Sequence, residues 1–442
     1  MMMQDGFGNT VSTTSEGTID AIDRFSNSLI GYGTDFAVVF EQSDADPECA
    51  VLAALATQLG LFMESPDRLA IADKYLTRAV EAAPRATLRE QLFVEAMLAH
   101  RNADYTKAIS CHRRLAAEFP EDLLSAKIGQ TLYFNLGNDE GMLWLADQVL
   151  DAHQGNAYVH GMRAFGLEQM SRLEEAEEEG RRATEMKRCE PWAHHAVAHV
   201  MITQGRLDDG IQWMQTLSDE WGGCNSFMYT HNWWHLALFH LEKEEFDEAL
   251  ALYDRSVWGR EKTYSQDQIN AISLLWRLEL AGVDVGDRWM DVANYVADRS
   301  FNNDQPFLDM QYIFALARGG KEEAVTGLLA GMNKQAKEGP AMTRTVWRDV
   351  AVPAAEAFVA YAKGEFGKVI DLLGPARVRM QSIGGSHAQR DLFEQVWIDS
   401  LLKVRDFETV MPLIEKRLEF RRPVKLDQTL MMRARNAQSA YS

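Results

Sequence analysis

Histidine and tryptophan are concentrated in one segment of this 442-residue chain. Residues 191–240 hold six of its eleven histidines and five of its eleven tryptophans. His195 and His199 are four residues apart, and so are His231 and His235. Residues at this spacing lie on one face of a helix, so each pair can direct two imidazole rings at a single ligand. The sequence therefore predicts that the functional site lies in this segment.

Paired imidazoles on one helix face are suited to a metal ion. Histidine nitrogens bind zinc, iron, copper or nickel, and the same spacing supplies two ligands in the HExxH zinc helix. The candidate metal ligands are His195, His199, His231 and His235. The segment lacks the HExxH glutamate, and Asp254 can supply a carboxylate only if the fold brings it close. A histidine-ligated metal site is thus one interpretation.

A second interpretation is acid–base chemistry, because histidine titrates near neutral pH. His387 follows Gly384-Gly385 and the predicted N-cap Ser386, so it lies in a first helical turn whose N–H groups favour an anion. Arg390 in the same turn is predicted to hold the anionic group of a small ligand. The catalytic candidates are His195, His199, His231, His235 and His387, and the predicted ligand-binding residues are Trp192, Asn232, Trp233, Tyr253, Asp254, Gln389, Arg390 and Asp391.

Two further interpretations stay open. In one, the tryptophans and histidines only pack between helices and satisfy buried backbone groups. In the other, the helices form a protein-interaction scaffold with a groove for a peptide and no catalysis. Clamp-type peptide grooves present Lys, Arg and Asn, whereas this segment offers aromatic rings and imidazoles, which suit a compact ligand. We expect a small-molecule enzyme or binder with its pocket on the concave face, and leave catalysis undecided.

The two histidine pairs are about one helical repeat apart. A shift of 36 residues carries His195 onto His231 and His199 onto His235, and a tetratricopeptide repeat is about 34 residues long. Residues that pack at helix crossings recur in steps of 34 with a last step of 39, at Ala108, Met142, Ala176, Gly210 and Ala249. Methionine is large for such a position. The spacing predicts an all-α, tetratricopeptide-like, right-handed superhelix of antiparallel helix pairs.

The repeat pattern varies along the chain, which we expect to form one continuous solenoid. Residues 1–16 are polar and without periodicity, and predict a flexible N-terminal arm. Residues 17–258 carry the tetratricopeptide-like repeats. Residues 259–345 keep helical periodicity but lose the 34-residue spacing, and residues 346–442 return to helical repeats followed by a tail.

Composition limits the partners that we expect. A net charge of −20 disfavours nucleic acid and anionic membrane surfaces, and no apolar run approaches the ~18 residues that span a bilayer. The start of the chain has no secretory pattern, and the four cysteines have no CxxC spacing. We therefore predict a cytoplasmic protein that binds a small anionic molecule or a peptide, with no nucleic-acid or membrane partner. No cofactor is identified, and homo-oligomerisation is left open.

Several polar blocks resemble a known family. WAHHAVAHVMITQGRLDDG at residues 192–210, HNWWHLALFHLE at 231–242, SLLWRLELAG at 273–282 and GGSHAQRD at 384–391 resemble the tetratricopeptide-repeat protein 38 family in content and order. The resemblance spans most of the chain and implies the helical-repeat fold. It implies no defined activity. One stretch departs from the family. Many members have a histidine after a glycine near residues 55–61, whereas this chain reads Ala54-Leu-Ala-Thr-Gln58 there.

Overall fold

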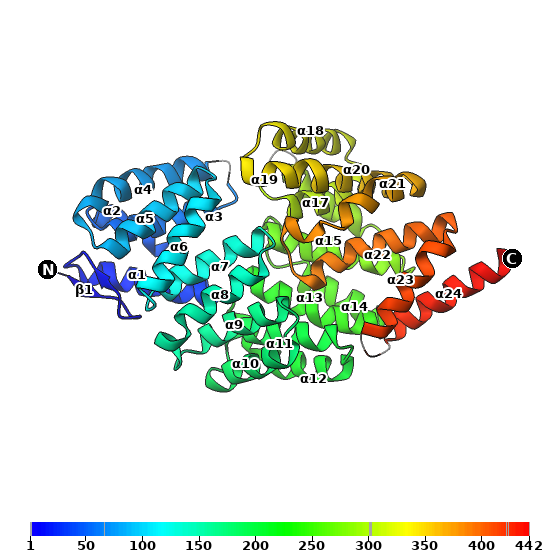
Figure 1. The fold of residues 1–442 in the computed structure, drawn as a ribbon, viewed down its shortest axis with the longest axis horizontal. Helices are drawn as coiled ribbons and strands as arrows, with labels where there is room; N and C mark the ends of the chain where they lie inside the picture. Colours follow the sequence, from blue (N-terminus) through cyan, green and yellow to red (C-terminus); the bar gives the residue numbers. More distant parts are fainter. Residues whose placement is uncertain (1, 66, 300–302, 421, 423, 442) are drawn as a thin grey trace. The chain divides into compact units, whose positions relative to one another are not determined.

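The computed structural model describes residues 2–65, 67–299, 303–420, 422 and 424–441. In these residues the secondary structure is helical apart from two short strands (Figure 1). Contacts divide the chain into two compact units. The first unit comprises Met1–Phe134, Asn138–Ala196 and Glu220–Asn225, and the second comprises Asn135–Gly137, Val197–Asp219 and Ser226–Ser442.

The first unit begins with a two-stranded antiparallel ribbon and continues as successive helices. Its elements are β1 (Met3–Gln4), β2 (Thr10–Val11), α1 (Glu16–Ile30), α2 (Val38–Ala45), α3 (Ala50–Phe62), α4 (Arg68–Ala82), α5 (Leu88–Arg101), α6 (Tyr105–Glu118), α7 (Leu123–Asn135), α8 (Asp139–Leu150), α9 (Ala157–Gln169) and α10 (Leu173–Met186). Helix α11 (Pro191–Thr203) starts in this unit, and the boundary crosses it after Ala196.

The second unit holds the remaining helices. They are α12 (Leu207–Leu217), α13 (Ser226–Glu242), α14 (Phe246–Leu252), α15 (Ser265–Leu280), α16 (Arg288–Val296), α17 (Pro306–Arg318), α18 (Glu322–Glu338), α19 (Ala341–Val346), α20 (Val352–Ala362), α21 (Phe366–Arg377), α22 (His387–Val404), α23 (Phe407–Phe420) and α24 (Lys425–Tyr441). Two π-helical turns, Tyr253–Val257 after α14 and Trp347–Ala351 before α20, interrupt the α-helical hydrogen bonding.

Each helix pair combines a helix that is buried on most sides with an amphipathic one. In the first unit α9 is almost wholly buried, whereas α10 buries only Ala176, Gly180 and Ala183. These three residues recur at the helical period, so they form one narrow stripe that packs against α9. The small residue matters at such crossings: in the second unit a Cβ on Gly210 of α12 would lie 2.2 Å from the ring of Phe239 on α13.

The predicted all-α, tetratricopeptide-like fold class is confirmed by this architecture. The residues predicted at helix crossings are buried, and Ala108, Met142, Ala176 and Ala249 are each at most 1% exposed. The four predicted ranges, and their continuity as one solenoid, stay a prediction. Among the described residues, none of the helices is both long enough and apolar enough to cross a membrane.

The N-terminal segment is hydrogen-bonded to the first unit, and its predicted flexibility stays a prediction. Ser12 donates a hydrogen bond to Glu90 on α5 at 2.6 Å, and Arg89 donates to the carbonyl oxygen of Thr10 at 3.2 Å. Thr13 donates to Asp46 at 2.8 Å. Hydrogen bonds from polar side chains thus connect this segment to the first unit. Such bonds leave no hydrophobic periodicity in the sequence.

Candidate metal centre

Three histidines of the second unit face one another. His199 lies on α11, and His231 and His235 lie on α13. Each offers a ring nitrogen within 4.8 Å of those of the other two. The ring centroids of His199 and His235 are 4.5 Å apart, and those of His231 and His235 are 4.8 Å apart. The three side chains are at most 3% exposed, so this histidine triad is enclosed by protein.

A chain of hydrogen bonds from α15 orients His231. Thr230 donates from its hydroxyl to Asp267 at 2.9 Å, and Asn270 donates from Nδ2 to the Thr230 hydroxyl at 3.2 Å. The amide oxygen of Asn270 therefore faces Nδ1 of His231, at 2.9 Å. Because an amide oxygen only accepts, Nδ1 carries the proton and the lone pair of the ring is on Nε2. Such a partner fixes both the tautomer and the ring orientation of a metal-binding histidine.

Burial keeps the imidazoles of His231 and His235 neutral at physiological pH. Loss of solvation lowers the pKa of His231 to about 3, despite the opposing hydrogen bond with Asn270. Burial also lowers the pKa of His235 well below its ordinary value, and the nearby His199, His231 and Arg277 add to the effect. Neutral imidazole is the form that binds metals.

The sequence prediction missed Arg277, a buried cation beside the triad. Arg277 lies on α15, two helical turns after Asn270, and its guanidinium carbon is 5.5 Å from the ring centroid of Trp234. It donates to the carbonyl oxygen of Ala388 at 2.6 Å and to the Ser273 hydroxyl. Burial lowers the pKa of Arg277 to about 10, so the guanidinium is still charged at neutral pH. Arg277 lies within the 273–282 block, but nothing in its spacing pointed to the histidines.

His195 and Trp192 belong to the first unit and precede His199 on the continuous helix α11. His195 is one turn before His199 on this helix. The Trp192 ring stacks on His195 with centroids 4.3 Å apart. Tyr32 stacks on Trp192 in turn, at 5.1 Å. His195 is therefore aligned with His199 along the helix and supported by aromatic rings of the first unit.

The first turn of α22 is formed as predicted, and the predicted role of its arginine in ligand binding stays a prediction. Ser386 caps the helix, and Gln389 completes a capping box. Arg390 donates to the carbonyl oxygens of Gly384 and Gly385, and Asp391 accepts from Arg417 at 2.5 and 3.2 Å. It is Arg277 that reaches this turn from α15, through Ala388. His387 is half-buried at the start of the helix.

Other predicted residues are dispersed through the second unit. Asn232 is buried on α13, and Trp233 beside it is half-buried. Tyr253 is buried in the first π-helical turn, and burial raises the pKa of its hydroxyl. Asp254 is half-exposed and accepts from Arg288 at 2.6 and 2.9 Å. The group of metal-ligating side chains does not include Asp254.

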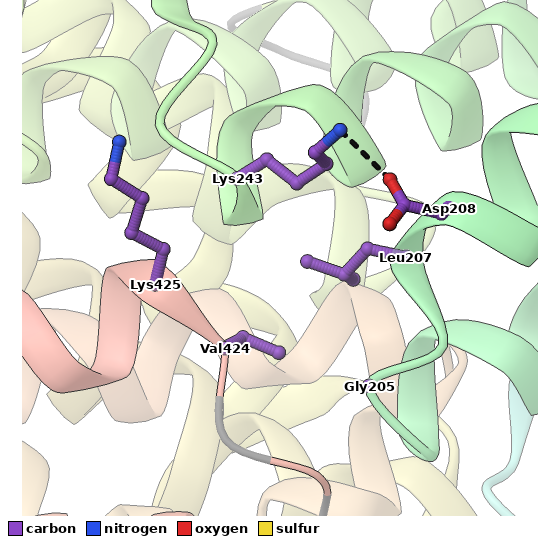
Figure 2. A pocket seen from close by; sticks show the side chains of 6 residues that line it. All are labelled: Gly205, Leu207, Asp208, Lys243, Val424 and Lys425. Atoms are coloured by element: carbon purple, nitrogen blue, oxygen red, sulfur yellow. Dashed lines mark ion pairs between the residues drawn. The ribbon is translucent and has the colours of Figure 1, made fainter.

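A pocket of about 270 Å³ lies away from the triad (Figure 2). Figure 2 shows Lys243 directed at Asp208, 2.9 Å away, with Lys425 on the other side. Its lining residues are Gly205, Leu207, Asp208, Lys243, Val424 and Lys425. None of the residues predicted to line the concave pocket is among them, so the histidine-lined pocket stays a prediction.

The helix pairs and the triad define a tetratricopeptide-like helical-repeat protein with a candidate metal centre. No family model matches the chain. Two solved structures of monomeric IFIT1 mutants match, one with m7Gppp-AAAA and one with Gppp-AAAA. Each is 13% identical, and the match covers 95% of this chain and 99% of that chain with a TM-score of 0.40.

These matches correct one prediction and assign no ligand. Net charge led us to exclude nucleic acid, yet both matching structures contain a nucleic-acid ligand. The prediction of no nucleic-acid partner is withdrawn, because a total charge does not describe the charge of one surface. A match at this TM-score transfers no binding property to this chain.

Proposed function

We propose that this chain binds a divalent transition-metal ion through His199, His231 and His235. The observation that carries the proposal is the convergence of three buried ring nitrogens within 4.8 Å of one another, from two different helices. Tetrahedral nitrogen ligands at about 2.0–2.1 Å from a zinc ion are about 3.3 Å apart, so the three nitrogens would move closer by at most about 1.5 Å on binding. The hydrogen bond from His231 to Asn270 supports it, because it places the lone pair on Nε2.

The ligand set favours zinc chemistry with an open coordination position. Three histidines with water or a substrate in the fourth position are a known arrangement of catalytic zinc. A metal held in this way polarises a bound oxygen atom and lowers the pKa of bound water. We therefore propose that small-molecule binding or catalysis takes place on the metal. His195, one turn before His199 in the sequence, was also predicted as a ligand, and that role stays a prediction.

Metal content of matched variants tests the proposal. Wild type and His235→Gln are purified, loaded with Zn²⁺, dialysed against a weak chelator and measured by elemental analysis. His112→Gln is the control, since His112 is a fully buried histidine of the first unit that is bonded to Ser125. We expect one zinc per chain in wild type and control, and affinity at least ~100-fold weaker in His235→Gln. Equal zinc in a folded His235→Gln protein would exclude the site.

Cobalt(II) substitution distinguishes three histidine ligands from four. Tetrahedral Co²⁺ absorbs visible light, and its spectrum changes when a ligand is replaced. If His195 is a ligand, His195→Ala changes both the spectrum and the affinity. If it is not, the spectrum of this variant matches wild type, and the open position belongs to solvent or substrate.

We also propose membership of the tetratricopeptide-repeat protein 38 family, which rests on the polar blocks quoted above. The capped turn of the GGSHAQRD block supports the proposal, since Ser386 and Gln389 form the capping box that such a block would preserve. The same zinc measurement on a member of that family is the test, and we expect stoichiometric metal there. The cytoplasmic location and the oligomeric state stay predictions.

A further inference from the structure

The histidine triad contains no negative charge of its own. Neither a carboxylate nor a thiolate belongs to the group of ligands among the described residues. A divalent ion held by neutral imidazoles would therefore keep both of its charges in a buried position. Buried charge is costly unless an opposite charge is close.

Arg277 adds a further positive charge beside this position. Its guanidinium lies over Trp234, whose ring is 4.7 Å from that of His235, and it acts electrostatically on His235 itself. The side chain cannot easily turn away, because Ser273 and the carbonyl oxygen of Ala388 accept its hydrogen bonds. The arginine is thus held near the proposed metal position.

The acids near Arg277 are shared with a second arginine. Asp391 and Glu242 attract Arg277, and both also act on Arg417. Arg417 is bonded to Asp391 at 2.5 Å and to Asp427 at 3.3 Å. Asp391, Glu242 and Asp427 thus lie around Arg277 and Arg417, and Asp267 is a fourth acid, buried and connected to His231 through the hydrogen bonds of Thr230 and Asn270. None of these four acids belongs to the group of metal-ligating side chains, so a metal ion held by the triad would have no anionic ligand from the described residues.

We infer that the metal centre takes a small anion, a carboxylate or an inorganic oxyanion, as its exogenous ligand. This inference rests on the metal site proposed above. One atom of the anion would coordinate the metal in the open position while the remaining charge lies in the field of Arg277. Because the triad is at most 3% exposed, the ligand has only a few heavy atoms. Arg277, and not the predicted Arg390, is the residue that favours the anion.

Anion binding to the cobalt(II)-loaded full chain tests the inference. Azide and acetate serve as anionic probes and imidazole as a neutral probe, each titrated while the visible spectrum of cobalt is recorded. Arg277→Met should weaken both anions about tenfold or more, since a nearby buried charge is lost. It should leave imidazole affinity unchanged and cobalt affinity equal or stronger. Arg390→Met is the matched control and should leave azide affinity unchanged.

The outcomes separate this inference from the proposed function. If wild type binds no cobalt, the metal site itself is wrong. If wild type binds cobalt but azide and acetate leave its spectrum unchanged, the metal site stands and the anion is wrong. Equal weakening of azide and imidazole in Arg277→Met shows a structural effect and overturns the role of Arg277. If that variant does not fold, Arg277→Lys is used in its place. A parallel loss of imidazole and azide binding in Arg277→Lys would also contradict the role of Arg277.

Discussion

Buried histidines occur in both units, but their surroundings differ. In the first unit His160 directs Nδ1 at Glu179, 2.7 Å away, and Nε2 at the carbonyl oxygen of Gln154, 3.0 Å away. His194 accepts from Trp221 at 3.2 Å and donates to the carbonyl oxygen of Arg188 at 2.8 Å. Each of these rings is engaged by side chains and carbonyl groups around it. In the second unit, three imidazoles instead face one another.

The comparison shows that burial does not distinguish a structural histidine from a candidate ligand. His160 and His194 are as buried as His231. What differs is convergence: the first two use both nitrogens to satisfy nearby groups, as buried polar atoms must. The triad gathers three rings at one point, where packing alone would favour apolar side chains. Mutual geometry is thus a better criterion of function than residue type or exposure.

The largest expected effect that tests this difference is stabilisation by metal. Zinc at 100 times its dissociation constant should add about 2.7 kcal/mol to the free energy of unfolding of wild type. His199→Gln should abolish this increment, because one of three ligands is lost. Chemical denaturation with and without zinc is the measurement. An increment that survives in His199→Gln would place the metal elsewhere.

The matching prediction for the first unit is a loss of stability without loss of metal binding. His160→Phe removes the donors to Glu179 and Gln154, and should cost about 1.5–3 kcal/mol, as expected for hydrogen bonds to charged groups. The increment produced by zinc should remain that of wild type. Denaturation of this variant with and without zinc is the measurement. A smaller zinc-dependent increase in the free energy of unfolding than in wild type would contradict the distinction between structural and metal-binding histidines.

A smaller effect is expected from the residues that orient each kind of ring. Asn270→Ala removes the partner of His231, and should weaken zinc binding about 10–100-fold. Ser125→Ala removes the partner of His112 in the first unit and is the control. It should leave zinc affinity at the wild-type value while costing about 0.5–1.5 kcal/mol of stability. Competition titration with a chelator measures both. Similar zinc affinities in the two variants would contradict the role of Asn270.

The smallest effect concerns acid sensitivity in the first unit. Burial lowers the pKa of His153, although its hydrogen bond to the carbonyl oxygen of Glu121 opposes the change. A histidine with a lowered folded-state pKa stabilises the fold above its ordinary pKa of about 6.5, and this contribution is lost as the pH falls below it. His153→Gln should therefore unfold with a weaker dependence on pH below about 6.5. An unchanged dependence, measured by thermal denaturation, would exclude this role.

Local periodicity predicted the part of the site that lies on repeating helices. The i, i+4 spacing and the 36-residue shift were sufficient to predict that His199, His231 and His235 face a common ligand. Asn270 and Arg277 were missed, because they lie on α15, beyond the π-helical turn at Tyr253–Val257. The non-helical segment 258–264 separates this turn from α15, so the 34-residue spacing is lost before Asn270 and Arg277.

Side-chain direction limited the rest of the prediction. The N-cap at Ser386 was predictable, because capping depends on neighbouring residues. The direction of Arg390 was not, because its guanidinium bends back to the carbonyl oxygens of Gly384 and Gly385. A sequence shows which groups carry charge, but long side chains choose among many rotamers. Charge partners that are distant in sequence, such as Arg277, emerge only from the packed helices.

The hydrogen bond from Arg277 to Ala388 also bears on the order of events during synthesis. The two residues are 111 positions apart, whereas the triad is complete once residue 235 has been made. Contacts of such separation form after local ones, since a long loop must close first. A growing chain would thus present all three imidazoles before α22 exists to anchor Arg277. The positive charge of Arg277 would then take its place only after the three imidazoles have been made.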